Sequence, residues 1–119
     1  MENHIPVKVV ILNNRFLGMV RQWQELFYQE RYSSVDLGST PDFVKVAEAY
    51  GAVGLRAVKP ADVVPVLKEA LKSKRTVFMD FVTARYEKVF PMVPAGASIN
   101  EMIFGEEGKK EEKKLKAVK

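Results

Sequence analysis

The chain contains 119 residues, of which 47% are hydrophobic and 29% are charged, and it has no cysteine. This length and composition are those of one ordinary globular domain with its own core, and the chain is too short for two domains. Without cysteine, the chain cannot form a disulfide framework, use a thiolate nucleophile or hold a cysteine-ligated zinc ion. The lack of cysteine also fits a reducing cytoplasm, which is the expected location.

The formal net charge is +4, and half of this excess lies near the C-terminal end. Residues 106–119 contain six lysines, four glutamates and few apolar residues, so we expect a disordered tail there and a domain over residues 1–105. A nucleic-acid-binding protein should show a basic face with aromatic or helical support, and this sequence shows none. No apolar run approaches the roughly 20 residues that span a bilayer, and residues 1–6 lack the features of a signal peptide. We therefore expect no nucleic-acid partner and no membrane insertion.

The first two elements are predicted to be a strand and a helix. Residues 7–12 form a β-branched apolar run that follows Pro6 and stops at Asn13, which is typical of a largely buried strand. From Leu17 onward, apolar residues recur at helical spacing and predict a helix that fades around residues 28–31. Its apolar side would consist of Val20, Trp23, Leu26 and Phe27.

A second helix is predicted to start at Thr40-Pro41-Asp42, after a turn-rich segment. Thr40 can cap the helix, Pro41 suits its first position, and Asp42 favours the positive end of the helix dipole. Gly51 can adopt the left-handed conformation that ends many helices. The predicted apolar stripe is Phe43, Val46, Ala47 and Tyr50.

The alternation of strand and helix continues to residue 82. Residues 54–58 predict a short strand, Pro60 begins a third helix, and residues 76–82 predict a third strand. Pro65 would remove a hydrogen bond and bend the third helix if it lies beyond the first turn. The apolar stripe of that helix would be Val63, Val64, Leu67, Ala70 and Leu71. An irregular stretch at 91–96 and one helical turn near 98–103 complete the body.

Strands separated by helical segments pair in parallel with right-handed crossovers, and the helices cover the sheet. The predicted fold class is therefore α/β, a three-layer open parallel sheet of the Rossmann-like kind with only three strands. In such a sheet, ligands bind beyond the carboxyl ends of the strands. Residues 13–18 lie at such a place, between the first strand and its helix.

The residues at this strand end have two interpretations. An Asn carbonyl is a neutral oxygen donor that suits Mg²⁺ or Ca²⁺, a helix N-terminus suits a phosphate, and Gly18 would allow close approach of the main chain. The commoner structure for Asn13-Asn14 after a strand is an ordinary turn whose side chains bond to local backbone. Taken alone, the pattern favours the ordinary turn.

The longer sequence around Asn13-Asn14 favours the ligand-binding interpretation over the ordinary turn. Residues 9–28, which include Leu-Gly-Met-Val-Arg-Gln-Trp-Gln at 17–24, resemble the large, catalytic subunit of the acetolactate synthases nearly residue for residue. The resemblance covers about residues 4–104 and includes Pro-Met-Val-Pro at 91–94. These two strings are specific within the thiamine-diphosphate enzymes, whereas an Asn pair marks only the superfamily. The resemblance implies the C-terminal part of a truncated thiamine-diphosphate-binding domain.

The resemblance also implies roles for individual residues. Asn14 would ligate Mg²⁺ through its side-chain oxygen, and Phe16 would ligate it through its main-chain carbonyl. Val20 and Trp23 match positions at the substrate channel. The residues implied to bind the cofactor are Asn14, Phe16, Leu17, Gly18 and Met19.

These apolar residues have a structural alternative. Met19, Val20 and Trp23 lie on a helical stripe, and such a stripe is usually core. The resemblance favours the channel for Trp23, whereas Leu26 and Phe27 are still expected to be core residues.

Two charged positions are interpreted as structural. Arg21 lies four residues before Glu25 and is expected to pair with it on a solvated face. Asp80 lies inside a predicted strand and is expected to form a structural ion pair, with Arg75 and Arg85 nearby in the sequence.

The sequence lacks several parts that the resemblance implies for the family. The cofactor motif begins with Gly-Asp-Gly upstream of the Asn pair, its Asp is another Mg²⁺ ligand, and the residues before Asn13 do not contain it. A glutamate from a partner subunit and an FAD-binding domain are absent as well. His4, the only histidine, precedes the first strand and is not expected to be a catalytic base. No catalytic residue is therefore assigned.

The resulting hypothesis is a fragment of an acetolactate synthase that is inactive on its own. For the whole enzyme, the resemblance implies condensation of pyruvate with pyruvate or 2-oxobutyrate in branched-chain amino-acid biosynthesis, with thiamine diphosphate, Mg²⁺ and FAD. The implied partners are the rest of the large subunit and a second large subunit in a homo-oligomer. Whether a regulatory small subunit also binds is left open by the sequence. The exposed sheet edge predicts that the isolated chain associates. The alternatives are a standalone truncated paralogue that acts as a binding module, and a related thiamine enzyme such as glyoxylate carboligase.

Overall fold

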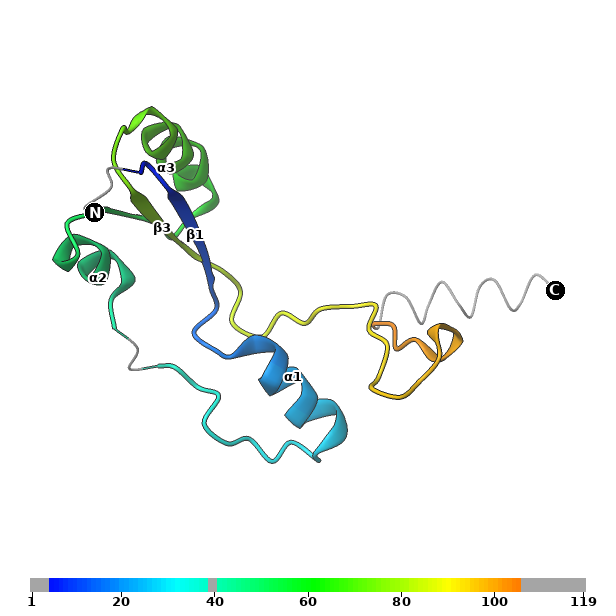
Figure 1. Ribbon diagram of the computed structural model, residues 1–119. Helices are drawn as coiled ribbons and strands as arrows, with labels where there is room; N and C mark the ends of the chain where they lie inside the picture. Colours follow the sequence, from blue (N-terminus) through cyan, green and yellow to red (C-terminus); the bar gives the residue numbers. More distant parts are fainter. Residues whose placement is uncertain (1–4, 39–40, 106–119) are drawn as a thin grey trace. The chain divides into compact units, whose positions relative to one another are not determined.

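A computed structural model describes residues 5–38 and 41–105 of the chain (Figure 1). The chain divides into two compact units, Met1–Glu87 and Lys88–Lys119. His4, Thr40 and the predicted tail at 106–119 lie outside the described residues, and the domain boundary at residue 105 stays a prediction. Within the described ranges, no helix is long and apolar enough to cross a membrane.

The first unit is built on a sheet of three strands, β1 (Lys8–Asn13), β2 (Val53–Ala57) and β3 (Val77–Val82). All pairings are parallel and the order is β1-β3-β2, so β3 is the central strand. Successive β3 residues are buried or half-buried, as expected of an internal parallel strand with both faces covered. The predicted strands and their parallel pairing are confirmed, with boundaries shifted by one residue.

Helix α3 (Pro60–Lys72) covers one face of the sheet. Alternate residues of a strand point to the same face, so Val77, Met79 and Phe81 share this side of β3. They form the buried core cluster together with Ala57 and Ala70. Half-buried residues of β2 and α3 pack against the cluster, namely Val53, Leu55, Val63, Val66 and Leu67.

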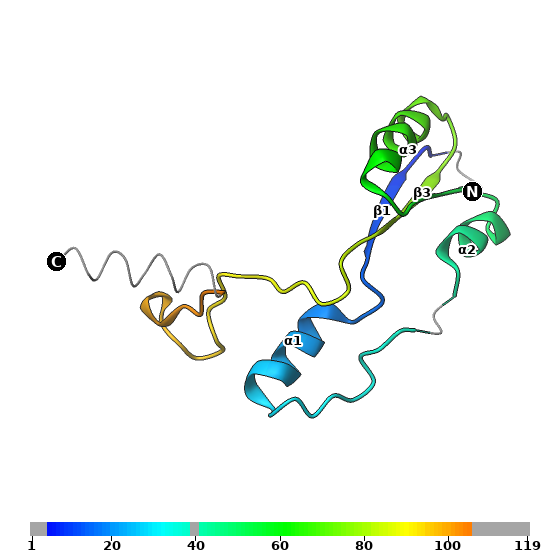
Figure 2. The same ribbon diagram turned by 180° about the vertical axis from the view of Figure 1, so that it is seen from behind.

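Helix α2 (Phe43–Ala49) covers the opposite face. A Cβ atom built on Gly54 would lie 2.6 Å from the Val44 carbonyl oxygen, so the backbones of β2 and α2 are in close contact there. Gly54 alternates with Val53 and Leu55, which face α3. The sheet therefore lies between the two helices (Figures 1 and 2), and the three-layer α/β prediction is confirmed.

The start of α2 differs from the prediction by one position. The Asp42 carboxylate accepts hydrogen bonds from the amides of Val44 (3.0 Å) and Lys45 (3.3 Å), so Asp42 itself is the N-terminal cap. The predictions that Pro41 takes the first helical position and that Asp42 lies inside the first turn are therefore wrong. Gly51 has a φ of 74°, which confirms the left-handed residue after the helix.

The predicted apolar stripes of α2 and α3 are only partly buried. Ala47 and Ala70 are buried, as predicted, but Tyr50, Val64 and Leu71 are exposed. The stripe of each helix was predicted too wide, because only side chains directed at β2 and β3 are covered. Pro65 lies inside α3, beyond its first turn.

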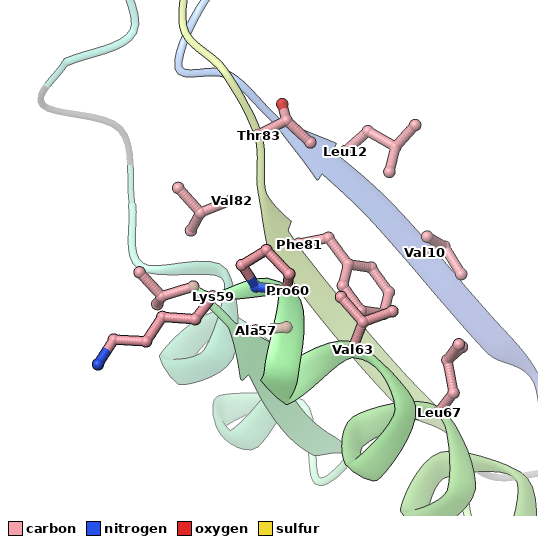
Figure 3. A pocket seen from close by; sticks show the side chains of 11 residues that line it. Val10, Leu12, Ala57, Lys59, Pro60, Val63, Leu67, Phe81, Val82 and Thr83 are labelled. Carbon is pink, nitrogen blue, oxygen red and sulfur yellow. The ribbon is translucent and has the colours of Figure 1, made fainter.

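The edge strand β1 is left uncovered on the α3 side. Val10 and Leu12 are in register with Met79 and Phe81 and therefore share their face, yet Leu12 is 73% exposed. An apolar groove of about 460 Å³ runs between β1 and α3 (Figure 3). We call it the β1–α3 groove. The residues that line it include Val10, Leu12, Val63, Leu67 and Phe81.

Helix α1 (Gly18–Phe27) follows β1 after a short loop. Its buried residue is Gln22, whereas Leu26 and Phe27 are exposed. The expectation that these two residues belong to the core is wrong for the described chain, because no described helix or strand packs extensively against α1.

In the second unit, residues 91–96 are irregular, as predicted. Met92 and Ile103 pair in an antiparallel bridge with amide–carbonyl distances of 2.9 and 2.7 Å. The predicted turn is a 3₁₀ helix, η1 (Ile99–Glu101), and the amide of Ser98 donates to the Glu101 carboxylate (2.8 Å). This bond from Ser98 lowers the pKa of Glu101 from its ordinary value.

Candidate functional site

The candidate site is the loop between β1 and α1, residues 13–18. The side-chain oxygen of Asn13 accepts the amide of Arg15 (3.0 Å), and that of Asn14 accepts the amide of Phe16 (3.0 Å). These are the local bonds that the ordinary-turn interpretation requires. A carbonyl oxygen has two lone pairs, so each Asn keeps a direction in which it can bind a ligand. Metal binding at Asn14 stays a prediction that the geometry permits.

The backbone of this loop is strained and held from outside. Arg15 has a φ of 61°, a left-handed conformation that costs a non-glycine residue about 1–2 kcal/mol. The amide of Leu17 donates to the Val35 carbonyl (2.9 Å), and the amide of Leu37 donates to the Arg15 carbonyl (3.0 Å). The segment 35–37 therefore ties down the chain on both sides of Phe16. Strain of this kind persists only where the surroundings fix it, and it is concentrated at functional sites.

The Phe16 carbonyl is available to a ligand. Phe16 forms an antiparallel bridge with Asp36. Within residues 5–38 and 41–105, however, no hydrogen bond ends on its carbonyl oxygen. A backbone carbonyl needs a partner such as protein, water or a ligand, and Mg²⁺ accepts oxygen donors of this type.

Gly18 begins α1 and lies against Asn14. A Cβ atom at position 18 would be 3.2 Å from the Asn14 side-chain nitrogen, which is tighter than ordinary contact. Leu17 caps α1 without a side-chain hydrogen bond, so the first helical amides have no side-chain acceptor there. A larger residue at position 18 would displace the Asn14 amide and crowd the helix end that could face a diphosphate.

A cluster of arginines and aromatic rings surrounds the Phe16 side chain. The guanidinium carbon of Arg21 lies 5.1, 5.0 and 5.0 Å from the ring centres of Phe16, Tyr32 and Tyr86. That of Arg85 lies 4.5 Å from the Phe16 ring centre and 5.9 Å from the Tyr86 ring centre. All of these distances lie in the range of cation–π attraction. We call these five residues the arginine–aromatic cluster; sequence reasoning missed it because its members come from segments far apart in the chain.

The predicted ion pair of Arg21 and Glu25 is confirmed, with Nη1 2.9 Å from Oε2. Its surroundings differ from the prediction, since the two side chains are only 16% and 19% exposed rather than on a solvated face. Partial burial, assisted by the negative charge of Glu25, raises the pKa of the Tyr32 hydroxyl above its ordinary value. Tyr32 is therefore neutral beside the Arg21 guanidinium.

The remaining predicted site residues lie along α1. Met19, Val20 and Trp23 are all exposed, and Trp23 is 47% exposed, so the described residues do not bury them in a core. Val20 and Trp23 line a pocket of about 450 Å³ together with residues from the C-terminal end of α1 and beyond, namely Gln24, Tyr28 and Arg31. The helix thus presents an apolar wall that could border a channel, and the channel assignment stays a prediction.

A second pocket, of about 400 Å³, opens at the carboxyl ends of the strands on the α2 side. Arg56 crosses it: Nη2 donates to Asp42 Oδ1 (2.6 Å) and Nε donates to Asp80 Oδ2 (2.9 Å). Asp80 is buried, and within the described chain its Oδ1 atom has no hydrogen-bond partner. The hydrogen bond from Arg56 holds the pKa of Asp42 below its ordinary value, and the hydrogen bonds that Arg56 donates to Asp42 and Asp80 raise the pKa of Arg56.

The predicted ion pair of Asp80 is therefore present, but its predicted neighbours were wrong. Parallel pairing places Arg56 of β2 beside Asp80 of β3 in register. The guanidinium of Arg75 instead donates to the Gly51 carbonyl, and that of Arg85 to the Asp36 carboxylate. Strand register, which sequence distance does not reveal, decides the partner.

The candidate ligands match Mg²⁺ in type but not in number. Asn14 and Phe16 offer neutral oxygen atoms, whereas Mg²⁺ needs near-octahedral oxygen coordination and usually one or two carboxylates. Among the described residues, no group of three or more His, Cys, Asp or Glu side chains could hold a metal ion. The loop therefore fits one side of a metal–diphosphate site.

Comparison with known proteins also indicates a protein that binds a diphosphate cofactor. Residues 1–81 match the family of thiamine pyrophosphate enzymes, in the part described as the C-terminal TPP binding domain. The chain is 53% identical over 102 residues to the acetolactate synthase of Mycobacterium leprae. It is 46% identical over 101 residues to the acetolactate synthase large subunit of Haemophilus influenzae.

These alignments cover 82% and 84% of this chain but only 16% and 18% of the two relatives. Among solved structures, the chain is similar to the thiamine diphosphate-dependent 4-hydroxybenzoylformate decarboxylase of Rhodococcus jostii RHA1, with a TM-score of 0.63 and 28% identity. That similarity covers 69% of this chain and 15% of the decarboxylase. The chain thus spans less than a fifth of each of these relatives.

Proposed function

Because the chain belongs to the thiamine pyrophosphate enzymes, through their C-terminal cofactor-binding domain, we propose that it forms one part of an acetolactate synthase large subunit. The identity to the synthases of two bacteria, Mycobacterium leprae and Haemophilus influenzae, supports this assignment within the family. The specific strings at 17–24 and 91–94 support it as well, since they extend from the loop into α1 and into the second unit.

The reaction proposed for the whole enzyme is the condensation of pyruvate with a second pyruvate or with 2-oxobutyrate. The first pyruvate would lose its carboxylate as CO₂, and the products would be 2-acetolactate with a second pyruvate or 2-aceto-2-hydroxybutyrate with 2-oxobutyrate, which lead to branched-chain amino acids. When bound, thiamine diphosphate supplies the carbanion chemistry that joins the two 2-oxo acids, and the protein binds and orients the reactants.

The observation that carries the proposal is the loop at residues 13–18. Asn14 would hold Mg²⁺ through its side-chain oxygen and Phe16 through its carbonyl, while Gly18 keeps the start of α1 open to the diphosphate. The remaining cofactor contacts would come from Leu17 and Met19. Val20 and Trp23 would form part of the wall that excludes water from the bound 2-oxo acids.

We further propose that this chain is inactive by itself. The described residues supply only neutral metal ligands at the loop, and catalysis requires a preorganised set of groups around the cofactor. The rest of the large subunit and a second large subunit would complete the site, FAD would occupy another domain, and a cytoplasmic homo-oligomer is the proposed assembly.

A chimeric enzyme tests the proposed function. The segment of the Haemophilus influenzae large subunit that aligns with this chain is replaced by the chain itself, and 2-acetolactate formation is measured. We expect activity to be retained and to be lost in the Asn14→Ala chimera. A folded, cofactor-supplied chimera that makes no acetolactate would contradict the assignment.

A second candidate function is that of a binding module, a truncated relative that docks on another protein. The exposed β1–α3 groove favours it, because large exposed apolar patches often mark interaction sites. The genomic sequence upstream decides between the two: an in-frame Gly-Asp-Gly supports the enzyme, and a stop codon shortly before Met1 supports the module. The products of the whole protein would separate an acetolactate synthase from a glyoxylate carboligase.

A further inference from the structure

Two arginines contact the side chain of the residue whose carbonyl is the proposed second metal ligand. Arg85 lies 4.5 Å and Arg21 5.1 Å from the centre of the Phe16 ring. Arg85 Nη2 also binds Asp36 Oδ2 at 2.6 Å, and Asp36 is the residue that pairs with Phe16 across the antiparallel bridge. Arg85 therefore links the ring of Phe16 to the segment that holds its backbone.

Arg21 is anchored independently of Arg85. Its Nη1 atom lies 2.9 Å from Glu25 Oε2 on the next turn of α1, and its guanidinium lies 5.0 Å from the ring centres of Tyr32 and Tyr86. The Tyr86 ring is itself 5.7 Å from the Phe16 ring. The guanidinium cannot move away from Phe16 without losing the ion pair and the other ring contacts.

The backbone around Phe16 needs this support. Arg15, the preceding residue, is in the left-handed region, and no hydrogen bond within the described chain ends on the Phe16 carbonyl. The planar peptide group that carries this carbonyl is held by one hydrogen bond, from the Leu17 amide to the Val35 carbonyl, so a fixed Phe16 side chain adds a second restraint. The arginine–aromatic cluster provides that fixation from α1, from residue 32 and from the segment after β3.

We propose that Arg21 and Arg85 are positioning residues: they fix the orientation of the Phe16 peptide group and so direct its carbonyl oxygen as a ligand for a divalent cation. The inference rests on the proposed function, in which Phe16 is a metal ligand. The planar guanidinium is the required group, because a lysine ammonium keeps the charge but cannot stack on an aromatic face in the same way.

The first test needs no ligand and uses the full 119-residue chain. Hydrogen exchange is followed by NMR at the amides of Leu17 and Leu37, which tie the loop to residues 35–37. In the double variant R21K/R85K we expect both amides to exchange about five- to tenfold faster, with the amides of β3 unchanged. The matched control is R75K, which alters a guanidinium that binds the Gly51 carbonyl, and no change at the loop is expected. Unchanged exchange in the double variant would overturn the proposal.

The second test uses Mn²⁺ with thiamine diphosphate as a paramagnetic probe. In the wild-type chain, we expect line broadening at the Asn14 side chain and at the Phe16 carbonyl carbon. In the double variant, the Asn14 signal should still broaden while the broadening at Phe16 falls severalfold; loss of both together would indicate a merely stabilising role. Equal broadening of Phe16 in both proteins would refute the positioning role. Broadening at neither residue in the wild type would contradict the proposed function instead, and the exchange experiment would still decide whether the arginines fix the loop.

Discussion

The sheet and the loop that carries the candidate site are stabilised in different ways. In the sheet, the buried side chains Val77, Met79 and Phe81 of β3 pack against α3, while α2 closes the other face. In the loop and α1, the fixing interactions are hydrogen bonds from amides to Asn side chains, backbone hydrogen bonds with residues 35–37, one ion pair within α1, and cation–π contacts. Val35 is the one buried apolar residue among positions 14–38.

This difference implies that the sheet with α2 and α3 is stable and that the loop at residues 13–18 and α1 open locally more easily. Burial of apolar area contributes most to stability, whereas exposed polar contacts contribute little each. Segments with few buried apolar contacts open locally at lower free energy than the core, and binding loops are drawn from such segments. The four substitutions below test this contrast.

The largest effect is expected in the core. Met79→Ala removes a buried side chain from the centre of β3 and should lower the free energy of unfolding by about 2–5 kcal/mol. The matched control is Leu71→Ala on α3, where the side chain is 73% exposed and the change should stay within about 0.5 kcal/mol. Urea denaturation followed by circular dichroism measures both. Equal losses would mean that β3 is not the stabilising centre.

The next effect concerns the site. In the chimeric synthase, Asn14→Ala should weaken the apparent affinity for Mg²⁺ by at least about tenfold, because one ligand oxygen is lost. Asn13→Ala removes a similar local turn bond, to the amide of Arg15, and serves as the matched control. Magnesium dependence of the initial rate measures the change. A comparable loss in both variants would show that the turn, not the metal contact, is what matters.

A smaller effect is expected on association of the isolated chain. Leu12 on the open edge strand is 73% exposed beside the β1–α3 groove, so Leu12→Lys should reduce self-association. Leu71→Lys changes an equally exposed leucine on α3 and is the control. Sedimentation velocity at tens of micromolar separates them. A wild-type chain that sediments as a compact monomer would remove the basis for this prediction.

The smallest effect is the pH dependence at the cap of α2. The hydrogen bond from Arg56 keeps the folded pKa of Asp42 below its ordinary value of 3.8. The stabilisation is therefore present above about pH 3.8 and is lost as the pH falls through the lower folded value. Asp42→Asn should flatten this part of the stability curve, which thermal unfolding between pH 5 and about pH 2 would reveal. An unchanged acid limb would show that the pair with Arg56 does not affect stability.

Local patterns in the sequence were enough to predict the order of strands and helices, the parallel pairing and the left-handed Gly51. They were not enough for the contacts that tertiary structure decides. Arg56 became the partner of Asp80 through strand register, and Asp42 became a cap instead of a first-turn residue. Leu26 and Phe27 follow the spacing of a buried stripe but are exposed, because helical periodicity shows which face is apolar and not what covers it.

The rule that ligands bind beyond the carboxyl ends of parallel strands located the candidate loop, and the resemblance favoured its ligand-binding role. The details of the loop depend on residues distant in sequence. The two Asn turns follow from known local preferences. The contacts of Phe16 with Arg85 and with the 35–37 segment could not be predicted from local preferences, since these residues are neighbours only after folding.

The most direct test is an NMR titration of the isolated chain with thiamine diphosphate and Mg²⁺. If residues 13–18 form one side of a divalent-cation and diphosphate site, binding should be weak, in the millimolar range, and shift changes should concentrate at Asn14–Met19 and vanish in Asn14→Ala. Micromolar binding would mean that the loop needs no carboxylate from elsewhere. Saturable binding whose shifts fall outside this loop would contradict the assignment itself.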